Sequence, residues 1–205
     1  MRYLLWFAEK TTASICFIHM KARPALIIST IAALIILISI TAVETATFAG
    51  GCFWCMEPPF EALDGVKEVV AGYTGGYTKN PSYEEVTAGG TGHYEAIQIS
   101  YNPLIISYEK LLEVYWQQIN PTDDGGQFVD RGQQYGSAIF YHNQLQKNLA
   151  EKSRQELEKS GIYYRPIATK ILPSTTFYPA EDYHQDYYIK NAESYELYKF
   201  FSGRK

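Results

Sequence analysis

Two of the three cysteines of this chain lie three residues apart, and cysteine is its most reactive side chain. The stretch GGCFWCMEPPF, residues 50–60, places Phe53 and Trp54 between Cys52 and Cys55, after a pair of glycines. Residues three apart on a helical turn have Cα atoms about 5 to 6 Å apart, within the range that a disulfide requires. The spacing therefore predicts that Cys55 can resolve an oxidised state of Cys52.

A CxxC pair has two other common interpretations. It can be half of a zinc site, but zinc needs further ligands, and the candidates His93, His142 and His184 are scattered singly along the chain. Both cysteines can also be small buried apolar residues. The context favours a reactive sulfur, because the pair lies where a strand leads into a helix, whose N-terminus favours a thiolate.

Five segments resemble the A-type peptide methionine sulfoxide reductases, in order, over roughly residues 46 to 190. They are GCFWCMEPPFEALDGV, VAGYTGGYTKNPSYEEV, TGHYEAI, FVDRGQQYGSAIF and FYPAEDYHQDY. The resemblance implies an oxidoreductase that reduces the S epimer of methionine sulfoxide, free or within proteins, and so repairs oxidised proteins. It also implies recycling by thioredoxin or a similar dithiol protein, and no metal or organic cofactor.

By this resemblance Cys52 is the nucleophile that attacks the sulfoxide sulfur. Phe53 and Trp54 would form a slot for the methyl group, consistent with sulfur–aromatic contacts worth about 0.3 to 1.5 kcal/mol. The attack would give methionine and a sulfenic acid on Cys52, which Cys55 converts to a disulfide. The C-terminal LYKFFSGRK contains no cysteine, whereas many relatives resolve with cysteines in that tail, so Cys55 is the expected resolver.

The resemblance also assigns the oxygen side of the site. Glu95 would lie partly buried with a raised pKa and donate its proton to the sulfoxide oxygen. Tyr83 and Tyr135 match the two tyrosines that flank this oxygen and would stabilise developing charge there. Asp130 matches a site aspartate that orients or tunes its neighbours.

Asp182 and His184, in AEDYHQDY, resemble a segment that packs beside the site in the family. We expect these two residues to support loop position or substrate binding rather than chemistry. Two other classes of protein compete with the reductase: a general dithiol oxidoreductase like thioredoxin, whose CxxC encloses Gly-Pro rather than Phe-Trp, and a membrane-anchored binding domain with tyrosine-rich loops.

The elements that position these residues follow from periodicity and turn signals. Strands are expected at 45–49, 66–73, 93–101, 137–142 and 167–172, and helices from the cysteines to about 63, at 107–120 and at 143–160. Pro58 and Pro59 are tolerable only near the first turn of their helix. The order predicts an α+β fold, the ferredoxin-like split β-α-β plan, with a mainly antiparallel sheet and helices on one side.

Composition excludes several classes of protein. The chain has 205 residues, 46% of them apolar, and a formal net charge of −4, which supports a folded core. From residue 51 onward 14 basic residues face 20 acidic ones, with no long basic stripe, so nucleic acid is not expected as a partner. The tyrosine count of 18 suits a pocket with a polar rim. We expect a monomer.

The N-terminal part suggests a location. Residues 25–43 form a run of 19 without charge, about the length of a bilayer span, after an irregular basic segment at 1–24 and before a catalytic domain at 45–205. The run is either a retained transmembrane anchor or a signal cut near Ala42. If translation starts at Met20, the run follows a short basic head typical of an export signal. We expect an anchored or exported protein, or a cytoplasmic one if this N-terminal segment is misassigned.

Overall fold

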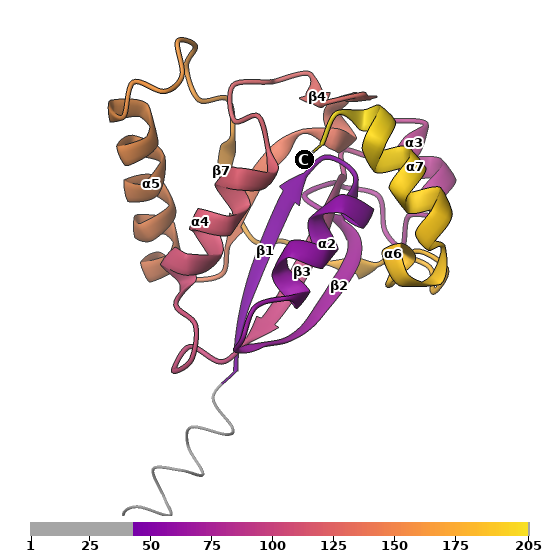
Figure 1. Cartoon of the computed structure of the whole chain (residues 1–205), viewed down its shortest axis with the longest axis horizontal. Helices are drawn as coiled ribbons and strands as arrows, with labels where there is room; N and C mark the ends of the chain where they lie inside the picture. Colours follow the sequence, from indigo (N-terminus) through magenta and orange to yellow (C-terminus); the bar gives the residue numbers. More distant parts are fainter. Residues whose placement is uncertain (1–42, 205) are drawn as a thin grey trace, which may run out of the picture. The chain divides into compact units, whose positions relative to one another are not determined.

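Residues 43–204 are described by the structure, a computed structural model (Figure 1). The segment 1–24 and residues 25–42 of the predicted apolar run lie outside the described residues. Among residues 43–204, no helix combines the length and the apolar character that a membrane crossing needs.

Strands and helices alternate along the described chain. They are β1 (Glu44–Gly50), α2 (Phe53–Glu61), β2 (Val66–Thr74), α3 (Tyr83–Thr87), β3 (Tyr94–Tyr101), α4 (Tyr108–Gln118), β4 (Gly126–Gln127), β5 (Asp130–Arg131), a 3-10 turn (Gln133–Tyr135), β6 (Ser137–Tyr141), α5 (Gln144–Lys159), β7 (Lys170–Pro173), β8 (Tyr178–Pro179), α6 (Tyr187–Lys190) and α7 (Ala192–Ser202). Apart from α3, β4, β5 and the 3-10 turn, which were not expected, this order matches the expected sequence of elements from β1 to β7.

The main sheet has the strand order β7-β6-β1-β3-β2-β8, with β1 inside it. β1 pairs antiparallel with β3 on one side and with β6 on the other, while β3 also pairs antiparallel with β2. β3 therefore separates β1 from β2, the two strands that α2 connects. Only β6 and β7 pair in parallel among the described strands, so the sheet is mixed and mainly antiparallel, as predicted for an α+β fold.

One face of this sheet carries the main core. Phe48 of β1 stacks on Tyr115 of α4, with ring centroids 4.9 Å apart. Phe60 of α2 also packs on the Phe48 ring, with centroids 5.7 Å apart. Residues from α2, α4 and α5 share this cluster with β1, β2, β3 and β6, so these three helices cover one face, as expected. Each large apolar side chain buried here contributes about 1.5 to 3 kcal/mol of hydrophobic free energy.

Local signals explain most helix boundaries. Ser107 caps α4, because its Oγ accepts a hydrogen bond from the Lys110 amide at 3.2 Å. The prediction for α2 needs correction, since the helix ends at Glu61 and its two prolines lie in the second turn rather than the first. Since proline has no N–H, α2 lacks two internal hydrogen bonds at this turn.

The C-terminal elements are not predicted by the sequence patterns. α6 and α7 follow β8, and the chain then returns to the end of β1, where Figure 1 shows the C-terminus beside the arrowhead of that strand. The guanidinium of Arg204 donates to the Gly50 carbonyl at 2.8 Å and to the Gln118 carbonyl at 3.3 Å. This return closes the C-terminal tail over the turn that carries Cys52.

Candidate active site

The turn between β1 and α2 places Cys52 directly before the first residue of the helix. Gly51 has φ +83°, a conformation that favours glycine, and a Cβ there would lie 2.3 Å from Nη2 of Arg204. A Cβ on Gly50 would lie 2.7 Å from Sδ of Met56. The glycine pair is therefore required by close packing, and it sets Cys52 at the N-cap of α2, at the end of an inner strand.

Cys52 and Cys55 are both reduced and buried, each 6% exposed. The Cys55 amide donates to the Cys52 carbonyl at 3.2 Å, and the two thiols are in hydrogen-bond contact. One helical turn therefore brings the two sulfurs together, as the spacing predicts.

Burial raises the pKa of Cys52 well above its ordinary value, and the thiol contact with Cys55 and the charge of Glu95 act in the same direction. The expectation that the helix N-terminus leaves Cys52 readily ionised is thus outweighed by desolvation. Cys52 is therefore a neutral thiol at neutral pH.

Glu95 lies on β3 beside this turn and is 1% exposed. Its Oε2 accepts a hydrogen bond from the Phe53 amide at 3.1 Å, which ties the carboxyl group to the start of α2. Burial raises the pKa of Glu95 to about 8, although this hydrogen bond opposes the shift. A carboxyl group with this pKa is mainly protonated at neutral pH and can act as an acid.

Tyr83 and Tyr135 reach the same region from the first residue of α3 and the last residue of the 3-10 turn. Burial raises the pKa of both hydroxyls, and the charge of Glu95 raises both further. Both hydroxyls therefore stay protonated at neutral pH and can donate hydrogen bonds. Glu95 and Cys52 both raise the pKa of each tyrosine hydroxyl through their charge, which indicates that the four groups lie together.

Asp130 joins the site through a residue that the sequence analysis missed. The hydroxyl of Tyr198, on α7, donates to Oδ2 of Asp130 and also contacts the Cys52 thiol. The only sequence signal was the abundance of tyrosine near the C-terminus, since α7 itself was not predicted.

Phe53 and Trp54 have different environments. Phe53 is fully buried and packs 6.5 Å from the Tyr83 ring, between centroids. Trp54 remains partly exposed and stacks on Tyr187 of α6, with centroids 3.8 Å apart and ring planes 8° apart. Tyr198 meets Trp54 edge-on at 6.0 Å. Trp54 is thus held rigid by α6 and α7 beside Cys52.

His184 is 1% exposed and lies with these rings, whereas Asp182 is exposed. Nδ1 of His184 accepts a hydrogen bond from the indole N–H of Trp54 at 3.1 Å, and the imidazole packs 4.3 Å from the Tyr83 ring, between centroids. Burial lowers the pKa of His184, so a neutral ring orients Trp54. The structure therefore brings His184 to the site but leaves Asp182 outside it.

The other two histidines lie elsewhere and have their own partners. Nε2 of His93 lies 2.7 Å from the Thr78 carbonyl, and Nε2 of His142 lies 2.9 Å from Oγ1 of Thr47. Within residues 43–204, neither histidine belongs to a group of side chains that could hold a metal ion.

Comparison with known proteins identifies the relatives of this site. A family model described as peptide methionine sulfoxide reductase matches residues 44–205. The peptide methionine sulfoxide reductase MsrA of Bacillus licheniformis is 59% identical over 162 residues, which cover 79% of this chain and 90% of the relative. The enzyme of the same name from Listeria monocytogenes serotype 4a is 59% identical over 161 residues, 78% of this chain and 91% of the relative.

Solved structures agree. Reduced Mxr1 from Saccharomyces cerevisiae superposes with a TM-score of 0.70 at 32% identity, covering 74% of this chain and 87% of Mxr1. Methionine sulfoxide reductase A of Corynebacterium diphtheriae gives 0.66 at 32% identity, covering 74% of this chain and 76% of that protein. Mxr1 has also been solved in complex with Trx2, and that chain matches with a TM-score of 0.51 at 25% identity, covering 71% of this chain and 85% of Mxr1.

The comparison contradicts the predicted location. The expectation of an anchored or exported protein depended on residues 25–43, but the family model begins at residue 44, and the Bacillus licheniformis enzyme is matched over 90% of its own length. The anchored or exported location is therefore wrong. An uncharged run of bilayer length is only a compositional signal, and the family's sequence is accounted for without it.

Proposed function

The chain belongs to the peptide methionine sulfoxide reductase family, and we propose that Cys52 is the nucleophile with which it reduces the S epimer of methionine sulfoxide. The activity of the family is thiol-dependent reduction of methionine sulfoxide, with thioredoxin as the recycling partner. One observation carries the assignment to Cys52: a buried thiol at the start of α2 lies beside a carboxyl group that burial keeps protonated.

In the first step the sulfur of Cys52 attacks the sulfoxide sulfur. Glu95 gives its proton to the sulfoxide oxygen and takes up the proton that Cys52 loses. The sulfur–oxygen bond then breaks and hydroxide leaves. Hydroxide attacks the Cys52 sulfur, the new sulfur–sulfur bond breaks, and methionine leaves, reduced by two electrons, while Cys52 remains as a sulfenic acid. The raised pKa of Glu95 supports this role, because an ionised carboxylate has no proton to give.

Tyr83 and Tyr135 support the oxygen side. Their hydroxyls remain protonated and can donate hydrogen bonds to the oxygen as it gains negative charge. Asp130 orients Tyr198, whose hydroxyl in turn contacts Cys52.

The methyl group of the substrate would lie against Trp54. The partly exposed indole is fixed by Tyr187 and by the hydrogen bond to His184, so it presents a rigid apolar face. Phe53 is fully buried, so it supports the indole and the rings behind it more than it contacts substrate.

Cys55 completes the cycle as the resolver. Its thiol displaces the hydroxyl group of the Cys52 sulfenic acid, water leaves, and a Cys52–Cys55 disulfide remains for thioredoxin to reduce. The thiol contact between the two residues supports this step, since little movement is needed.

Replacing Cys55 by Ser tests the assignment of both thiols. We expect one methionine per enzyme from a dabsylated methionine S-sulfoxide peptide, a mass increase of one oxygen on Cys52, and no thioredoxin-driven cycling. Cys52→Ser should form no methionine, and Cys16→Ser, at the remaining cysteine, is the matched control that should behave as the parent. Cycling of Cys55→Ser with thioredoxin at the parental rate would reject Cys55 as the resolver.

A further inference from the structure

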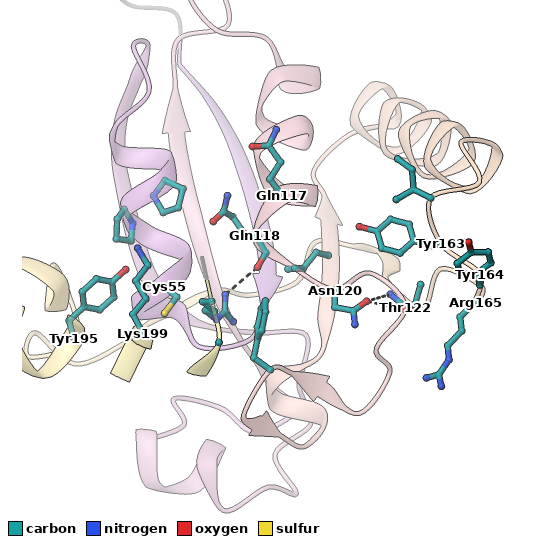
Figure 2. A pocket seen from close by; sticks show the side chains of 17 residues that line it. Cys55, Gln117, Gln118, Asn120, Thr122, Tyr163, Tyr164, Arg165, Tyr195 and Lys199 are labelled. Atoms are coloured by element: carbon teal, nitrogen blue, oxygen red, sulfur yellow. Dashed lines mark hydrogen bonds between the residues drawn. The ribbon is translucent and has the colours of Figure 1, made fainter. Parts of the chain in front are cut away.

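Cys55 faces a groove that Cys52 does not line. The groove has a volume of about 660 Å³ and lies between α2, α7 and the C-terminal end of α4 on one side and the loop after α5 on the other (Figure 2). Pro58, Ile119 and Tyr195 supply apolar lining near Cys55. Glu95, Tyr83 and Tyr135 do not line it, so the resolving thiol has an approach of its own, separate from the oxygen side of the active site.

The charged residues that line this groove are all basic. They are Arg165, Lys199 and Arg204, and no acidic residue lines it. Neither Lys199 nor Arg204 forms an ion pair with another residue in the described part of the chain. Figure 2 shows Lys199 beside Cys55, with Arg165 at the far side of the groove.

Arg204 is held in place but is not neutralised. Its guanidinium donates to the carbonyls of Gly50 and Gln118 and lies 4.7 Å from the centroid of the Phe128 ring, while its Nε is buried without a hydrogen-bond partner. The hydrogen bond with Cys52 lowers the pKa of Cys55, and the charges of Arg204 and Lys199 act in the same direction. A chain with net charge −4 thus concentrates unpaired positive charge around its resolving thiol.

We propose that this groove binds a low-mass thiol that carries carboxylate groups, and that this thiol reduces the Cys52–Cys55 disulfide by attacking Cys55. The inference rests on the proposed function and adds a second class of reductant to the thioredoxin of the family. The carboxylates of the thiol pair with Lys199 and Arg204, and its sulfur meets Sγ of Cys55.

The reduction balances with two molecules of thiol. The thiolate of the first attacks Sγ of Cys55, the bond between the two protein sulfurs breaks, and Cys52 leaves and takes up a proton. The second thiolate attacks the sulfur of the bound first molecule, which releases Cys55 as a thiol and a symmetric disulfide of the reductant. Two thiols lose two electrons and two protons, and the two cysteines gain them.

The size of the groove favours a small thiol over a protein surface. Sites for small molecules have volumes of about 300 to 1,000 Å³ and are concave, with a few polar groups that fix orientation. The groove meets this description, with walls from α2 and α7 on one side and the 162–165 loop on the other.

Glutathione and its diethyl ester are the probes that test the proposal, because they share a thiol and differ in two carboxylates. The measured quantity is the ratio of kcat/KM for glutathione to kcat/KM for the ester, in reduction of a methionine sulfoxide peptide by the full chain. We expect a ratio of about ten in the parent protein, falling with added salt, because ion pairs accelerate association and are screened.

Lys199→Glu should bring this ratio to about one or lower, and Lys199→Gln should give an intermediate value. Lys152→Glu, the same change on the exposed side of α5 and away from the groove, is the matched control and should keep the parental ratio. Turnover with dithiothreitol, which has no carboxylate, measures any change in the reactivity of Cys55 in each variant, and the ratio of glutathione to ester cancels that change.

Each remaining outcome decides against the proposal. A parental ratio near one, or a ratio that Lys199→Glu leaves unchanged, overturns it. A loss of thioredoxin-driven turnover in Lys199→Glu with an unchanged ratio assigns the groove to a protein partner and also overturns it. In either case, turnover with dithiothreitol leaves the proposed function intact. A parent protein that is inactive with dithiothreitol overturns both the proposed function and the proposed thiol site.

Discussion

At the scale of single residues, burial controls the protons of the active site. Glu95 and Cys52 are both desolvated, and desolvation raises the pKa of each. The resting site therefore holds its protons on the acid and on the thiol, and neither group carries a charge that water would have to stabilise. The arrangement stores the proton that the sulfoxide oxygen needs.

The role of Glu95 predicts the pH dependence of the reaction. The pKa of Glu95 is raised to about 8, so the protonated form is present below pH 8 and is lost as the pH rises through that value. We expect single-turnover methionine formation to fall above pH 8. Glu95→Gln should lower the rate at pH 7 by about 100-fold, the lower end of what general acids contribute. A rate that stays constant to pH 10 in the parent would contradict the assignment.

The Tyr198 hydroxyl supports a second prediction at this scale. Tyr198→Phe removes the donor to Asp130 and the contact with Cys52, and leaves a carboxylate without its partner beside the nucleophile. We expect kcat with dithiothreitol to fall about tenfold. Tyr195→Phe, on the same helix, is the matched control and should keep the parental kcat. Equal kcat values for the two variants would remove Tyr198 from the site.

At the scale of elements, the β1–α2 turn is the most constrained segment. It depends on glycines because Gly51 combines a positive φ with neighbours from two other parts of the chain, Arg204 and Gln127. The C-terminal tail and the loop that carries β4 therefore both close on the turn that holds Cys52. A larger side chain in this turn should therefore disturb the packing of the turn, the C-terminal tail and the β4 loop.

Gly51→Ala tests this packing. A Cβ would lie 2.3 Å from Nη2 of Arg204 and 2.7 Å from Cβ of Gln127, in addition to the backbone cost of about 1 to 2 kcal/mol. We expect a loss of about 3 kcal/mol in the free energy of unfolding, measured by urea denaturation. Gly89→Ala is the matched control, because Gly89 has φ +80° with open space around it, and it should lose only the backbone cost. Equal losses would show that the turn is not crowded.

The sequence predicted the elements whose signals are local and missed those that depend on distant contacts. The periodicity of β3, the periodicity of α4 and the CxxC spacing are each contained in a few residues, and the structure confirms β3, α4 and the start of α2 at the cysteines. α7 has no comparable signal, because its place is fixed by Tyr198 bonding to Asp130, 68 positions away. The high pKa of Cys52 was missed for the same reason, since burial is a property of the folded chain.

At the scale of the whole molecule, residues 43–204 contain all the groups that we assign to the reaction. The described residues belong to one compact unit, and neither Trp54 nor Glu95 lines the basic groove beside Cys55. Substrate and reductant therefore need not compete for the same surface.

We propose that the catalytic domain is independent of residues 1–42. A chain beginning at residue 43 keeps β1 and the Glu44 carboxylate, which accepts a hydrogen bond from Tyr101 at 2.9 Å. We expect this chain to keep the dithiothreitol-driven kcat of the full chain within about twofold, and its Tm within about 3 °C, which corresponds to about 1 kcal/mol for a domain of this size. A chain beginning at residue 51, which lacks β1, is the contrasting variant and should not fold.

The packing beneath the catalytic turn has a last consequence, which concerns Met56. The chain contains three methionines, and Met56 is the one in the catalytic domain, fully buried with its sulfur against Gly50. Oxidation of that sulfur would add a polar oxygen to a space that does not admit even a methyl group. The enzyme that repairs damaged thioethers therefore keeps its own thioether out of reach of peroxide, so that its folded domain does not become its own substrate.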